Sequence, residues 1–391
     1  MSHSSFPSLA TTLPNDVANA VLIGRIWVPE EGPYLVKVSA TQTTDLSGLA
    51  QTSSDLMEID NVAARVIQHQ GKTWSTESLW ANTDPQNRDE QQAWFLAPTD
   101  LQAIKAAGVT FVASMLERVI EEQARGDAAK AESVRKAVID VMGDNLRNVK
   151  PGTAQAIKLK EVLVAQGVWS QYLEVGIGPD AEIFTKSQAM SAVGSGFDVG
   201  LHPGSSWNNP EPEIVLVINS KGEVVGAAMG NDVNLRDFEG RSALLLGKAK
   251  DNNASCAIGP FIRLFDGQYT IDSVRSTDLS MAVHGPEGFV MQGSSSLSQI
   301  SRDPLDLAAQ AIGPCHQYPD GLVLFLGTMF APTQDRHGPG QGFTHVVGDT
   351  VAITTPQLGT LFNRVSTSDN VPAWTYGIRA LMKDLAKRSA Q

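Results

Sequence analysis

The chain has few of the residues that would place it outside the cell or in a membrane. Its 391 residues include only 2 cysteines, Cys256 and Cys315, which form no disulfide framework and have no metal-ligand spacing. No stretch approaches the ~18 apolar residues of a membrane span. The polar N-terminus has neither the basic nor the apolar region of a signal peptide. We therefore expect a cytoplasmic protein with no membrane partner.

Basic residues are also scarce. The chain has 30 Lys and Arg against 42 Asp and Glu, a formal net charge of −12. Nucleic acids and anionic membranes select for basic surfaces, so we expect neither as a partner. An anionic small molecule stays open as a ligand, because a metal ion and a few lysines can reverse the charge locally.

The length exceeds what one ordinary core accommodates, so the sequence predicts two domains. In the first half, residues 21–40 predict two strands around a turn. Thr99 or Asp100 is expected to cap a helix that begins near Leu101. Amphipathic periodicity predicts a helical segment from Met115 through the following 30 or so residues, and a further helix spans 154–166.

Two carboxylates precede a buried strand in the second half. Glu211 and Glu213 stand two residues apart before the apolar run 214–218, so their side chains point to the same face of the strand. Residues 219–222 have turn chemistry and 224–229 form the returning strand. That antiparallel return brings Asp232 beside the start of the first strand.

Three carboxylates in one half-buried place repel each other unless a cation lies between them. Oxygen ligands favour Mg²⁺, or Mn²⁺, over zinc, and three of them leave positions open for water and substrate. We therefore expect Glu211, Glu213 and Asp232 to bind a divalent ion. The alternative is a solvated acidic strand edge.

Five motifs in order carry a family resemblance. PEPEIVLV at 210–217, GNDVNLRD at 230–237, KAK at 248–250, GP at 259–260 and the closing strands near 327–328 and 348–365 resemble the fumarylacetoacetate hydrolase superfamily. The resemblance implies an α+β fold with a mostly-β C-terminal catalytic domain of mixed β-sandwich roll type at 171–391. A smaller α/β domain would occupy 1–170.

The resemblance also implies roles for single residues. Lys250 and Glu182 match a lysine and a glutamate associated with catalysis in the family's sugar-acid branch. Lys186 matches a lysine that approaches the substrate, and Thr328 lies in a Gly-Thr that contacts the substrate carboxylate. Lys248 and Lys250 follow an apolar run, so we expect one or both to enter the pocket from the end of a strand or loop.

The segment 108–117 distinguishes the two activities considered for this chain, hydrolase and lyase. The family's hydrolases carry a His and, three residues later, a Glu that activate water; Ser114 and Glu117 stand at these positions here. The imidazole is absent, so the water-activating pair is incomplete, although Glu117 can still act as a base. Ser114 joins Thr328, Lys186 and Lys248 as a candidate substrate-binding residue.

This departure favours the sugar-acid branch, the 2-keto-3-deoxy-pentonate dehydratases. We expect a Mg²⁺-dependent lyase that converts such a 2-keto sugar acid to 2-oxoglutarate semialdehyde (2,5-dioxopentanoate). Lys250, with Glu182 or Glu117, would move the protons.

Two other functions stay open. One is a hydrolase that cleaves a carbon-carbon bond of a 2,4-diketo acid, and the other is a catalytically silent protein that binds a 2-keto acid. The Gly- and Pro-rich loop 329–343, with His337, is a candidate lid, though a plain surface loop is the alternative. The family resemblance implies a homo-oligomer, a dimer or a tetramer.

Overall fold

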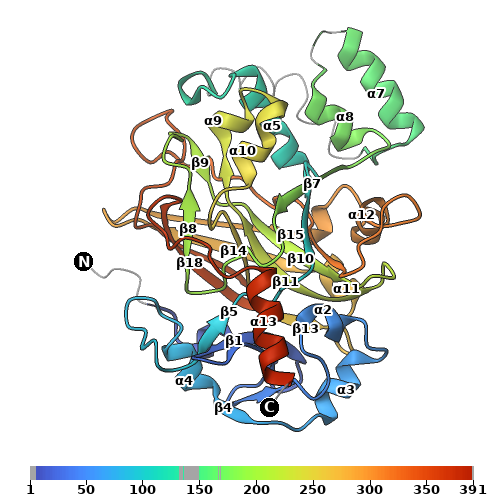
Figure 1. Cartoon of the computed structure of the whole chain (residues 1–391). Helices are drawn as coiled ribbons and strands as arrows, with labels where there is room; N and C mark the ends of the chain where they lie inside the picture. The colour runs from blue at the N-terminus through green and yellow to red at the C-terminus, as the bar shows by residue number, and fades with distance from the viewer. Residues whose placement is uncertain (1–5, 132–134, 136–148, 166, 168, 390–391) are drawn as a thin grey trace.

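The fold is described from a computed structural model for residues 6–131, 135, 149–165, 167 and 169–389. Three β-sheets and a set of short helices make up these residues, so the fold is α+β, as predicted. Figure 1 shows the helices within 112–123, 154–177 and 236–250 at one end of the molecule, while the strands within 22–28, 73–75 and 94–96 and the helices within 53–81 lie at the other end.

The largest sheet has 11 strands in the order β4-β3-β2-β1-β13-β11-β10-β16-β6-β7, with β5 paired to β1. Strands β16 and β6 are parallel, so the sheet is mixed. The strands are β1 Leu22–Val28, β2 Gly32–Val38, β3 Gln42–Asp45, β4 Thr73–Ser75, β5 Trp94–Leu96, β6 Ala103–Gly108, β7 Glu182–Ser187, β10 Pro212–Ile218, β11 Val224–Asp232, β13 Cys256–Leu264 and β16 Leu322–Phe325.

A 5-stranded sheet has the order β15-β14-β17-β18-β8, and β9 pairs with β12 in a short ribbon. These strands are β8 Asp198–Leu201, β9 Asn208–Asn209, β12 Asn234–Leu235, β14 Asp278–His284, β15 Val290–Ser296, β17 Thr350–Thr355 and β18 Gly359–Thr367. Leu216 and Met229 of the large sheet share one apolar core with Met281 and Leu361 of the smaller sheet. The two sheets therefore pack as a sandwich.

Helices cover the remaining apolar faces. They are α1 Leu9–Thr12, α2 Ser53–Met57, α3 Val62–Gln68, α4 Thr76–Ala81, α5 Val112–Gln123, α7 Ala154–Ala165, α8 Gln171–Ile177, α9 Arg236–Glu239, α10 Leu246–Lys250, α11 Ile271–Arg275, α12 Pro304–Ala311 and α13 Ile378–Ser389, with 3-10 turns η1 Ala243–Leu245 and η2 Leu297–Gln299. Val119 of α5 and Leu173 of α8 belong to a separate helical core. Among the described residues, no helix combines the length and apolarity needed to span a membrane.

Several predicted elements are confirmed. Strands β1 and β2 form the hairpin expected in 21–40, and β10 and β11 form the hairpin that carries the carboxylates. Helices α5 and α7 match the predicted helices that begin near Met115 and at Ala154. The later part of the first predicted helix, at 132–134 and 136–148, lies outside the described residues.

The helix predicted near Leu101 is wrong, because strand β6 occupies this segment and pairs with β16 and β7. Asp100 does cap a helix, but one distant in sequence. Its carboxylate accepts hydrogen bonds from the backbone N–H groups of Ser53 and Ser54 at the start of α2, and it pairs with Arg25 at 3.4 Å. A capping residue does not reveal which helix it caps when the partner is remote.

Strands from both predicted domain ranges share the large sheet. Strands β1–β6 come from 1–170, and β7, β10, β11, β13 and β16 come from 171–391. The boundary at 170/171 stays a prediction.

Candidate active site

The β10–β11 hairpin gathers three carboxylates. Its register pairs Glu213 with Gly230, and the backbone N–H of Asp232 donates to the carbonyl of Glu211 at 3.0 Å. One oxygen from each of Glu211, Glu213 and Asp232 lies within 4.8 Å of the others, and all three residues are buried. Three converging carboxylate oxygens fit a hard divalent ion.

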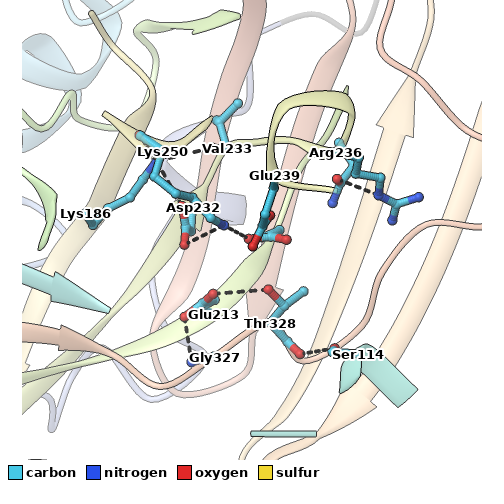
Figure 2. A network of polar contacts seen from close by, with 12 residues as sticks. Ser114, Lys186, Glu213, Asp232, Val233, Arg236, Glu239, Lys250, Gly327 and Thr328 are labelled. Carbon is cyan, nitrogen blue, oxygen red and sulfur yellow. Dashed lines mark hydrogen bonds and ion pairs between the residues drawn. The ribbon is translucent and has the colours of Figure 1, made fainter. Parts of the chain in front are cut away.

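Glu213 is fixed from the end of β16. The backbone N–H of Gly327 donates to Glu213 Oε2 at 2.7 Å, and Thr328 Oγ1 donates to Oε1 at 3.3 Å. Ser114 of α5 in turn donates to the carbonyl oxygen of Thr328 at 2.5 Å. Ser114 and Thr328, both predicted to bind substrate, therefore lie together beside the carboxylates (Figure 2).

Two buried lysines contact the same carboxylates (Figure 2). Lys250 Nζ lies 2.5 Å from Glu211 Oε2 and 3.1 Å from Asp232 Oδ2. Lys186 is fully buried, and its ammonium lies 2.9 Å from Asp232 Oδ1 and donates to the carbonyl oxygens of Val233 and Lys250. Lys250 is the last residue of the short helix α10. The prediction that it enters the pocket from the end of a strand or loop is therefore wrong.

Burial and neighbouring charges shift the pKa values of the carboxylates and of Lys250. Burial works to raise the pKa of Glu211, but Arg118 and Lys250 outweigh it and hold that pKa at about 2. Burial, with the carboxylates of Asp232 and Glu211, raises the pKa of Glu213 well above its ordinary value. Burial opposes the charge of Lys250, yet Asp232 and Glu211 keep its pKa above the usual range. Glu213 is thus stabilised less by the surrounding cations than Glu211 is, and a divalent cation would supply further positive charge beside it.

A second layer of charged side chains, which was not predicted from the sequence, contacts the site through Glu211. Arg118 of α5 pairs with Glu211 and, at 2.5 and 3.1 Å, with Glu121 and Glu239. Arg236 pairs with Glu121 at 3.2 Å and donates to Asn209 Oδ1 at 2.8 Å. All these charged side chains are almost fully buried. The only signal in the sequence was spacing, because Ser114, Arg118 and Glu121 recur at intervals of four and three on one helix face.

Glu182 begins β7, where it pairs with Gly108 of β6. Gly108 leaves space for the carboxylate, because a side chain there would collide with Glu182 Oε2. Burial and the carboxylate of Glu239 raise the pKa of Glu182 to about 7, against the opposing charges of Lys250 and Arg118. Glu182 is therefore suited to exchange protons near neutral pH.

Two predicted residues are placed differently. Glu117 lies on α5, and both of its carboxylate oxygens accept hydrogen bonds from Arg135, at 2.7 and 3.2 Å. This carboxylate is therefore held in an ion pair with Arg135. Lys248 is exposed, and its ammonium lies 5.1 Å from the centre of the Phe238 ring. The structure does not bring Lys248 to the carboxylates.

Residues 163–366 match the family described as "Fumarylacetoacetate (FAA) hydrolase C-terminal", which is more than half of the chain. The chain belongs to this family. The family prediction from the five motifs is confirmed.

Two relatives of the chain are named as dehydratases. One is the "Probable 2-keto-3-deoxyxylonate dehydratase" of Haloferax volcanii, 29% identical over 196 residues, or 50% of this chain and 64% of the relative. The other is the 2-dehydro-3-deoxy-D-arabinonate dehydratase of Saccharolobus solfataricus, 29% identical over 184 residues, or 47% of this chain and 58% of the relative. The matches thus span less than two thirds of each relative's length.

Solved structures share the fold. A 2-keto-3-deoxy-D-arabinonate dehydratase complexed with magnesium and 2,5-dioxopentanoate superposes with a TM-score of 0.61 at 18% identity, over 88% of this chain and 99% of the other. A 5-carboxymethyl-2-hydroxymuconate delta-isomerase from Mycobacterium smegmatis superposes with a TM-score of 0.53 at 18% identity, over 88% and 98%. Members of this fold therefore catalyse different reactions, so the fold alone does not identify the substrate.

Proposed function

We propose that the protein is a Mg²⁺-dependent lyase that dehydrates a 2-keto-3-deoxy-pentonate to 2,5-dioxopentanoate. The observation that carries this proposal is the position of Lys250, whose ammonium bridges Glu211 and Asp232 of the carboxylate triad. A proton donor or electrostatic stabiliser in this position lies where a 2-keto acid would meet the ion. The names of the two dehydratase relatives support the same reaction.

The ion would be held by the triad, Glu211, Glu213 and Asp232. Such an ion, Mg²⁺ or Mn²⁺, polarises the 2-keto group when bound and acidifies the protons on C3. Thr328 and Lys186, which contact Glu213 and Asp232, would orient the substrate carboxylate and ketone.

Glu182 and Lys250 would divide the proton transfers. A base takes a proton from C3, and an acid protonates the hydroxyl on C4, which leaves as water. Loss of a proton from C5 with protonation at C3 then gives an enol, which tautomerises to the aldehyde. A pKa of about 7 suits Glu182 to act as the base, and the retained charge of Lys250 suits it to act as the acid.

The hydrolase alternative is supported less well. A hydrolase needs an activated water, but Ser114 replaces the expected histidine and donates to the carbonyl of Thr328, while Glu117 is paired with Arg135. A cytoplasmic location and assembly into a dimer or tetramer stay predictions from the cysteine content and from the family.

A direct experiment is mass spectrometry of the purified protein with Mg²⁺ and a panel of 2-keto-3-deoxy-pentonates and 2,4-diketo acids, with and without chelator. Chelator-sensitive conversion of a deoxypentonate to 2,5-dioxopentanoate is the expected result, and it also assigns the stereochemistry. Pyruvate from a diketo acid with the deoxypentonates untouched would refute the lyase. Tight ion and keto acid binding without turnover would indicate a silent binding protein.

A further inference from the structure

The segment after the metal-site aspartate alternates between two environments. Val233 and Leu235 are buried in the apolar core between the sheets. Asp232, which ends β11, and Arg236, which begins α9, both belong to the charged network, through Lys250 and Glu121 respectively.

Asn234 of β12 lies directly opposite Asn209 of β9, and residues directly opposite each other in a strand pair share a face. Asn209 Oδ1 accepts a hydrogen bond from Nε of Arg236. The side chain of Asn234, the first residue of β12, therefore lies on the face of the β9–β12 ribbon that Arg236 contacts.

The amide of Asn234 is unusual because it is buried and unpaired. The residue is 0% exposed, and neither its Oδ1 nor its Nδ2 has a hydrogen-bond partner among the described residues. Nη2 of Arg236 is likewise buried without a partner in the described part of the chain. Leaving buried donors and acceptors unpaired is costly, and native proteins pair nearly all of them with protein, water or ligand.

The unpaired atoms define the chemistry of a ligand. Asn234 offers one acceptor and an NH₂ donor, and Arg236 offers a further donor. A ketone or carboxylate only accepts hydrogen bonds, so it would leave Asn234 Oδ1 unpaired. A hydroxyl group both donates and accepts, so it can donate to Asn234 Oδ1 and accept from Arg236 Nη2.

We propose that Asn234 and Arg236 form a subsite that binds a hydroxyl group of the substrate, the one on C5. This assignment to C5 rests on the proposed dehydratase function. The hydroxyl on C4 leaves as water, whereas the oxygen on C5 stays attached throughout the reaction. A subsite of this kind would select hydroxylated 2-keto acids over unsubstituted ones of equal length, because the latter leave its polar groups unpaired.

Two unreactive ligands isolate this contact. 5-Hydroxy-2-oxopentanoate and 2-oxopentanoate differ by one hydroxyl, and neither has a leaving group on C4. Calorimetric titration with Mg²⁺ present should show the hydroxylated acid binding about 10-fold more tightly, as two added hydrogen bonds predict. In Asn234→Leu the two acids should bind with equal affinity. The melting temperature of this variant should stay equal or rise, because an apolar side chain replaces an unpaired amide.

Two further variants make the test independent of folding problems. Asn234→Ala should abolish the ratio without adding volume. Asn363→Leu is the matched control, because Asn363 is equally buried but donates to the carbonyls of Gly194 and Phe197 at 3.0 and 2.9 Å. Asn363→Leu should lower the melting temperature and keep the ratio.

A wild-type ratio near one, a wild-type ratio retained in both Asn234 variants, or no binding of either acid would overturn the subsite. If both variants keep the wild-type affinity ratio, the partner of the Asn234 amide would be a buried water and not the substrate. Because neither ligand reacts, the ratio is independent of turnover. An intact ratio without dehydratase activity would refute the proposed function and keep the subsite.

Discussion

Lys250 Nζ lies 2.5 Å from Oε2 of Glu211, a carboxylate that also pairs with Arg118. Both residues are buried, so the contact is shielded from solvent. Under the proposed function, this cation would act on an oxygen of the substrate.

Lys250→Met should therefore lower kcat/KM for the deoxypentonate by about 10²–10⁴-fold, the usual contribution of a positioned acid or base. Lys221→Met is the control, since Lys221 is half exposed and pairs with Asp60 at 3.4 Å. It should retain wild-type turnover. Near-normal activity of Lys250→Met, with its circular dichroism unchanged, would exclude Lys250 from the chemistry.

Ion binding should depend on Glu213. Glu213→Gln preserves the size of the side chain and an oxygen that accepts from the N–H of Gly327, so the fold should be retained. Because the variant lacks one of three anionic ligands, its affinity for Mn²⁺ should fall by more than about 100-fold. Titration calorimetry measures this. Glu223 is the control, because its carboxylate accepts a hydrogen bond from Asn219 on the β10–β11 turn. Glu223→Gln should leave the affinity for Mn²⁺ unchanged.

Glu182 should give the protein a pH dependence. Its folded pKa of about 7 lies above its ordinary value of 4.5, so between these values the folded state binds a proton that the unfolded state lacks. The contribution of Glu182 to the free energy of unfolding therefore falls as pH rises from 4.5 to 7, and it levels off above pH 7. Glu182→Gln removes this loss.

The melting temperature of Glu182→Gln relative to wild type should thus increase between pH 5 and pH 8, while turnover falls. The wild-type rate profile should show an ionisation near pH 7 that the variant lacks. A constant difference in melting temperature across this range would contradict a raised pKa.

The sequence predicted the β10–β11 hairpin and its carboxylates because the signals are local. An apolar run, a turn and strand alternation together place Glu213 and Asp232 on one face. The position of Lys250 followed from the family resemblance, although its short helix did not. Contacts within one hairpin need no knowledge of the rest of the fold.

The second charged layer was missed because its partners are remote. Arg118 and Glu239 are more than 100 positions apart, and each resembles an exposed helix charge when only its neighbours are known. Asp100 was misread for the same reason, since its partners lie on α2 and β1. Burial of a charge depends on tertiary packing, which local periodicity does not report.

Arg118 offers a test of this layer through stability. It pairs with Glu121, Glu211 and Glu239, so Arg118→Met leaves three buried carboxylates without their shared cation. We expect a loss of about 3–5 kcal/mol in the free energy of unfolding. Arg275→Met removes an arginine that also pairs with two carboxylates, on Asp272 and Asp303, but at a partly exposed position. Its expected loss is at most about 1 kcal/mol. Urea denaturation of both variants compares them directly, and equal losses would mean that the layer around Arg118 is solvated and does not support the site.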